Sequence, residues 1–169
     1  MAIVTDKNAR RIFIGIDPGV SGAVAAIDEN LSLLGLEDAP TIKTDGKTLY
    51  DVGEMAATLR RFCLMGTAVV ILEQAQAMSG QGVTSTFHTG YGFGLWCGIL
   101  GALEVPYRMT KPSVWMKKIL SGSPGERKTR SVGFVSRMFP AAELIPPGCR
   151  KPRDGRADAV CLAYWGLKS

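Results

Sequence analysis

The sequence has few residues that could bind zinc. It contains a single histidine, His88, and four cysteines, none of which forms a CxxC pair or another close metal-ligand spacing: Cys63, Cys97, Cys149 and Cys161. A zinc site needs clustered Cys and His ligands, so we do not expect zinc. Three of the cysteines lie in apolar stretches with helical spacing, where a free thiol packs as a small core residue; this favours a reducing compartment.

Long apolar runs are also absent. No stretch reaches the roughly 20 apolar residues of a membrane span, and the first residues lack the apolar core of a secretory signal. We therefore expect no membrane partner. The expected location is cytoplasmic, in a bacterial cell or a phage-infected host, or an organelle if a transit peptide has been removed. A length of 169 residues suits one domain. We expect a single domain over residues 1–169, with residues 1–10 as a flexible N-terminal segment.

Positive charge is present in excess and is unevenly placed. The net charge is +5, and many of the Lys and Arg residues crowd the C-terminal half: Lys111, Lys117, Lys118, Arg127, Lys128, Arg130, Arg137, Arg150, Lys151, Arg153 and Arg156. A basic face attracts nucleic-acid phosphates by releasing their counterions. A solvated basic surface explains the same charge equally well.

The order of apolar patterns predicts an α/β fold with a mixed sheet flanked by helices. We expect strands over residues 11–17, 23–27, 31–36, 67–73 and 105–109, the last at a sheet edge because of Pro106. Helices are expected over residues 52–64, 93–103, 111–120, 127–139 and 154–167. The segments 40–47, 76–92 and 140–153 are expected to be loops.

The most informative feature is the position of the acidic residues. Asp17 and Glu73 each end an apolar strand, and Asp154 and Asp158 lie one turn apart at the start of the last helix. Four carboxylates from three elements could therefore converge, and such a cluster needs a cation to offset its repulsion. Oxygen ligands alone favour Mg²⁺ or Mn²⁺. Singly, Asp17 could be a turn residue, and Asp154 could be an N-cap.

These motifs resemble a known family. Residues 14–28 (IGIDPGVSGAVAAID), 71–74 (ILEQ) and 154–165 (DGRADAVCLAYW) are similar, in this order, to the acid-bearing segments of RuvC-type Holliday junction resolvases. Residues 90–100 look closest to the plant plastid branch and to related phage or bacterial forms. The four-residue spacing of the last acids also fits that branch. No aromatic residue follows the second acid closely, unlike in the bacterial enzymes, so base stacking would need another residue, such as Met78, Phe87 or Tyr91.

The resemblance implies an RNase H-like fold, a homodimer and a four-way DNA junction as substrate. It implies that Asp17, Glu73, Asp154 and Asp158 are catalytic and hold two Mg²⁺ ions, with Mn²⁺ as a substitute. DNA-binding residues are expected in the helices at Lys117, Lys118, Arg127, Lys128 and Arg130, and in the glycine-rich segment at Gly80, Gly82 and Tyr91, where glycines let the backbone approach phosphate.

Other functions remain open on the sequence. An RNase H-like nuclease could act on other branched DNA or on RNA–DNA hybrids. The segment around Asp17 also resembles the phosphate-binding hairpin of actin-like ATPases, although the second phosphate loop of those longer proteins is not evident. A catalytically inactive DNA-binding module is disfavoured because all four acids are present.

The helix expected over residues 93–103 is apolar all round. A helix packed on one side of a sheet should show a polar stripe, and this one has none. Gly94, Gly98 and Ala102 recur every four residues and form a smooth strip. We expect this helix to lie in the interface of a two-fold dimer, although full burial within one chain would also explain it.

Overall fold

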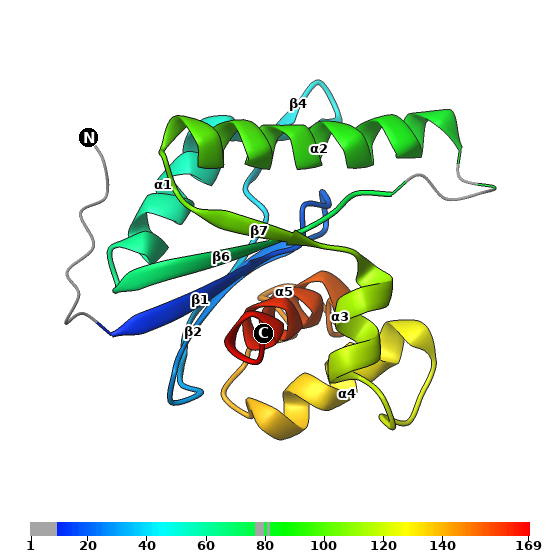
Figure 1. Ribbon diagram of the computed structural model, residues 1–169. Helices are drawn as coiled ribbons and strands as arrows, with labels where there is room; N and C mark the ends of the chain where they lie inside the picture. The colour runs from blue at the N-terminus through cyan, green and yellow to red at the C-terminus, as the bar shows by residue number, and fades with distance from the viewer. Residues whose placement is uncertain (1–9, 77–79, 81) are drawn as a thin grey trace.

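The computed structural model describes residues 10–76, 80 and 82–169, without the side chains of Arg127 and Lys128. Its centre is a five-stranded mixed sheet with helices on both faces (Figure 1). The expected α/β architecture is therefore confirmed. The predicted flexible segment 1–10 lies, apart from residue 10, outside the described residues.

The sheet has the strand order β3-β2-β1-β6-β7. Strands β1, β2 and β3 form an antiparallel meander, and β6 and β7 continue the sheet in parallel with β1. Their bounds are Arg11–Ile16 (β1), Ala23–Asp28 (β2), Leu33–Asp38 (β3), Thr67–Glu73 (β6) and Tyr107–Thr110 (β7). β1 is thus the central strand, and β7 is at an edge, as Pro106 predicts.

Two helical layers bury the sheet (Figure 1). Helices α1 (Val52–Cys63) and α2 (Val83–Ala102) cover one face, and α3 (Pro112–Ile119), α4 (Arg127–Met138) and α5 (Asp154–Leu167) cover the other. Side chains alternate along β1, so Ile14 packs towards α1 and α2 while Phe13 packs towards α5. None of the described helices is both long and apolar enough to cross a membrane.

Two expected loops are wrong. Part of the segment 40–47 is a hairpin of β4 (Thr41–Thr44) and β5 (Lys47–Tyr50), and its two connecting residues, Asp45 and Gly46, both have positive φ. That is the conformation an Asp-Gly hairpin turn requires, so the Asp45-Gly46 dipeptide itself favours this hairpin.

The second correction concerns residues 76–92, because α2 begins at Val83 rather than at residue 93. Gly, Ser and Thr have low helix propensity, so the sequence of this segment favours a loop over a helix. Tertiary packing favours the helix here: Gly92 lies directly against the Tyr50 hydroxyl and the Pro18 carbonyl. A side chain larger than hydrogen would not fit at that point.

Candidate active site at the carboxyl ends of two parallel strands

Asp17 and Glu73 follow the same point on two neighbouring strands. β1 and β6 are parallel, with Gly15 opposite Ile71 and Ile16 opposite Leu72. One further step along this register places Asp17 opposite Glu73. The carboxyl ends of parallel strands lie at the same edge of a sheet, so β1 and β6 bring these two acids side by side.

Both acids face the layer formed by α3, α4 and α5. Gly15, two residues before Asp17, lies against the α5 backbone, and Ile71, two residues before Glu73, contacts Gly166 of α5. Because side chains on one face of a strand recur every two residues, Asp17 and Glu73 point to the same side. The acids therefore face the helix that carries the other two candidate acids.

The turn after β1 fixes the Asp17 carboxylate. The Gly19 N–H donates to its Oδ1 at 3.0 Å, and the Tyr50 hydroxyl donates to the Pro18 carbonyl at 3.0 Å. Burial raises the pKa of Asp17 to about 6; the Gly19 N–H lowers it, and the nearby Asp154 carboxylate raises it further. Burial, with a smaller effect of Asp17, raises the pKa of Tyr50 to about 12, so the Tyr50 hydroxyl stays a proton donor.

The first turn of α5 packs against this turn. A Cβ on Gly155 would lie 2.9 Å from Asp17 Oδ2 and 2.8 Å from Gly22 Cα, so only glycine allows the approach. Asp154 is exposed and lies inside the helix, since the N-cap residue is Arg153 and makes no side-chain cap. Asp154 Oδ1 instead accepts a hydrogen bond from the Gly155 N–H at 3.1 Å. The N-cap alternative for Asp154 is therefore wrong.

Asp158 lies one turn further along α5 and is half-buried. Burial raises the pKa of Cys161, and the Asp158 charge adds to this rise. Asp158 thus lies on the side of α5 that is turned towards the protein interior. The i, i+4 spacing puts it on the same helix face as Asp154, as expected.

An ion-pair network ties the start of α5 to β3. The Arg156 side chain is buried and donates to Asp38 Oδ1 at 2.9 Å and to the Leu36 carbonyl at 3.2 Å. Arg153 donates to the other oxygen of Asp38, also at 2.9 Å. Sequence reasoning counted both arginines as part of a basic surface. In the structure, both arginines instead bind Asp38 and so hold the helix that carries Asp154 and Asp158.

Glu73 has a partner that sequence reasoning missed. The indole N–H of Trp115, in α3, donates to Glu73 Oε1 at 2.6 Å. Trp115 is fully buried. Nothing in the local sequence indicates this contact, because it joins residues 42 positions apart.

The four acids lie in one region of the structure, but their side chains do not converge on a single ion-binding point. Asp17 is close enough to Asp154 for their charges to interact, and Glu73 follows the neighbouring strand. Among the described residues, no three acidic, Cys or His side chains are arranged closely enough to hold one ion. The donors present are carboxylate oxygens, which fit a hard divalent cation. Repulsion between like charges opposes a tighter cluster unless a cation offsets it.

Solved structures share this arrangement of elements. The chain aligns with Thermus thermophilus RuvC in complex with a Holliday junction substrate at 17% identity, over 91% of both chains, with a TM-score of 0.62. The chain has a RuvC-like fold. A second Thermus thermophilus RuvC structure aligns at the same identity and coverage with a TM-score of 0.57. No protein-family profile and no curated protein sequence matches the chain. The RNase H-like fold expected from the motifs is confirmed.

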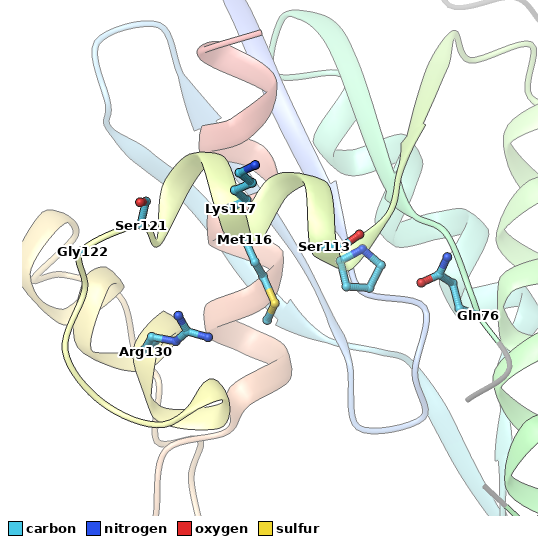
Figure 2. A pocket seen from close by; sticks show the side chains of 8 residues that line it. Gln76, Ser113, Met116, Lys117, Ser121, Gly122 and Arg130 are labelled. Atoms are coloured by element: carbon cyan, nitrogen blue, oxygen red, sulfur yellow. The ribbon is translucent and has the colours of Figure 1, made fainter. Parts of the chain in front are cut away.

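On this RuvC-like fold, a groove of about 620 Å³ runs between α3 and α4. Figure 2 shows Met116 pointing from α3 into the groove towards Arg130 of α4, with Gln76 on the far side. Lys117 also lines it. Gln76 lies three residues after Glu73, so the groove reaches the neighbourhood of the acids.

The predicted basic residues do not all lie in the groove. Lys117 and Arg130 line the groove, whereas Lys118 donates to the Lys168 carbonyl at 2.6 Å and lies 5.9 Å from the Trp165 ring centroid. Lys118 therefore contacts the C-terminal end of α5. Arg127 and Lys128 begin α4, and their side chains lie outside the described part.

The predicted glycine-rich contacts lie at the start of α2. Gly80 is exposed with a φ of +81°, and Gly82 is the N-cap residue of the helix. Tyr91 is half-exposed inside α2, where its ring stacks on Phe87 and meets the Tyr50 ring edge-on at 6.0 Å. Tyr50 in turn contacts the turn after Asp17, so this aromatic row connects α2 to the turn that holds Asp17. Met78 lies outside the described residues.

Proposed function

We propose that the chain is a metal-dependent endonuclease that resolves four-way DNA junctions. The observation that carries the proposal is the placement of Asp17 and Glu73 on adjacent parallel strands, facing the α5 turn that bears Asp154 and Asp158. The solved structure with the higher TM-score is a RuvC bound to a Holliday junction substrate. The groove between α3 and α4, which Lys117 and Arg130 line, supports DNA as the partner of this chain.

The four acids would hold two Mg²⁺ ions, with Mn²⁺ as a substitute. Divalent ions bound there supply activation of a water and stabilisation of the leaving 3′ oxygen during phosphodiester hydrolysis. The turn after β1 holds the Asp17 carboxylate. The ion-pair network of Arg153 and Arg156 with Asp38 holds the helix that carries Asp154 and Asp158. Lys117 and Arg130 would bind backbone phosphates in the groove, as would Arg127 and Lys128 in the wider basic region.

The decisive experiment is cleavage of a synthetic four-way junction in Mg²⁺, with nicks mapped on all four strands. Asp17→Asn should abolish cleavage and leave junction binding largely intact, because binding depends on phosphate contacts rather than on the acids. EDTA should stop the wild-type reaction, and Mn²⁺ should restore it. Wild-type rates in Asp17→Asn would show that the site is wrong.

Substrate class is tested in the same assay. Other branched DNA and an RNA–DNA hybrid are cut in place of the junction if the chain is another kind of RNase H-like nuclease. A plastid-type or phage-type relationship rests on the motif resemblance, and the mapped nick positions would test it. ATP binding by calorimetry tests the actin-like alternative.

We propose further that the nuclease is a two-fold homodimer whose interface includes α2. Gly94, Gly98 and Ala102 are exposed along α2, and a Cβ on Gly98 would meet no atom within 4 Å. Two equivalent sites related by a two-fold axis suit paired nicks in a four-way junction. Light scattering should give the mass of two chains, and Gly98→Arg should give one. A folded, dimeric Gly98→Arg would place the interface elsewhere.

A further inference from the structure

The Trp115 indole is held rigidly against the carboxylate of Glu73. Glu73 is opposite Thr110 in the register of β6 and β7, and α3 begins two residues after Thr110. The chain therefore turns from the end of β7 directly over Glu73. Trp115 is fully buried against the α5 layer, so packing fixes the direction of its N–H.

The contact is specific to one of the three tryptophans. In the described part of the chain, the buried indole N–H groups of Trp96 and Trp165 have no acceptor within hydrogen-bonding distance. The Trp115 N–H reaches Glu73 Oε1 at 2.6 Å. A short hydrogen bond to an ionised group in a buried setting is stronger than one between neutral groups.

We propose that Trp115 is a positioning residue that holds the Glu73 carboxylate in one orientation for a divalent cation. A glutamate side chain has three rotatable bonds, and a fixed donor on Oε1 removes most of that freedom. The indole nitrogen is a donor only, so it orients the carboxylate without competing for the cation. Partners of this kind typically change metal affinity or activity by about 10- to 100-fold. This inference rests on the proposed function.

The variant that tests it is Trp115→Phe, which keeps an aromatic ring in the core and removes the donor. Its matched control is Trp96→Phe, which makes the same change at a buried tryptophan of α2. The Mg²⁺ concentration that gives half-maximal junction cleavage should rise roughly tenfold in Trp115→Phe. It should stay at the wild-type value in Trp96→Phe. A role in packing alone would lower the melting temperature of both variants without moving this concentration.

A second measurement uses the folded wild-type protein without DNA. Its three tryptophans give three indole N–H resonances in a ¹⁵N-labelled sample. Trp96→Phe and Trp165→Phe each remove one resonance, which assigns the Trp115 signal even if Trp115→Phe does not fold. Adding Mg²⁺ should shift the Trp115 resonance and leave that of Trp96 unchanged.

The outcomes separate the two proposals. A wild-type protein that does not cleave junctions in Mg²⁺ overturns the proposed function and this inference with it. If the wild type cleaves, an unchanged Mg²⁺ requirement in folded Trp115→Phe overturns the positioning role alone. So does a Trp115 resonance that stays fixed at Mg²⁺ concentrations that support cleavage.

Discussion

Gly15→Ala should destabilise the protein through the contact between β1 and α5. Gly15 lies in the central strand, and its missing side chain faces the α5 backbone. A Cβ there would lie 2.5 Å from the Ala163 nitrogen and 2.8 Å from the Leu162 Cβ, and would contact the Ala159 carbonyl oxygen. Carbon atoms pack at about 3.5–4.0 Å, so α5 would have to move outward by about 1 Å.

The magnitude follows from which atoms must move. Overpacking a core costs about 1–3 kcal/mol, and the upper end applies because backbone atoms cannot rotate away. We therefore expect the free energy of unfolding to fall by about 3 kcal/mol. At about 2–4 °C per kcal/mol for a domain of this size, the melting temperature should fall by roughly 6–12 °C.

Thermal unfolding followed by circular dichroism tests this expectation. Gly133→Ala is the matched control, because a Cβ at this α4 position would lie 3.6 Å from Arg137 Nη1, an ordinary contact. Replacing a helical glycine by alanine removes a conformational cost, so this control should be stabilised by up to about 1 kcal/mol. A melting temperature for Gly15→Ala within one degree of wild type would refute the direct packing of α5 on β1.

Other substitutions test the ion-pair network between α5 and β3 and the groove between α3 and α4. Arg156→Met should cost about 2–3 kcal/mol in urea unfolding, because it breaks a buried ion pair, while the half-exposed Arg153→Met should cost under about 1 kcal/mol. Equal losses would contradict the assigned burial. Lys117→Ala should weaken junction binding and reduce the slope of log affinity against log salt by about 1. Lys118→Ala, whose ammonium contacts the end of α5, should leave that slope unchanged; a matching reduction would show that both lysines bind phosphate.

The sequence predicted those features that depend on local pattern. Apolar runs that end in Asp17 and Glu73 indicated two strands, and the helical spacing around Asp158 indicated α5 with its observed bounds. The pairing of β1 with β6 could not be read from the pattern, because strand order depends on contacts between distant segments. The adjacency of the first two acids is therefore a result of the structure.

The sequence did not predict the role of residues whose contacts depend on where their side chains point. Lys117 and Lys118 are neighbours in α3 and point about 100° apart: Lys117 lines the groove with Arg130, whereas Lys118 contacts the end of α5. Arg156 lies among basic residues in the sequence yet is buried against β3. In each case the sequence shows the charge of the side chain, but not the group that it contacts in the folded protein.

Glycine is required at two points on the acid-bearing side of the sheet. Gly15 lets α5 lie directly on β1, and Gly155 lets its first turn reach the Asp17 carboxylate. One contact is made in β1, two residues before Asp17, and the other is made by the first turn of the facing helix. Asp154 and Asp158 are carried on the same rigid helix, so both contacts set their distance from Asp17. A side chain at either glycine would therefore alter the spacing of the acids even where the protein still folds.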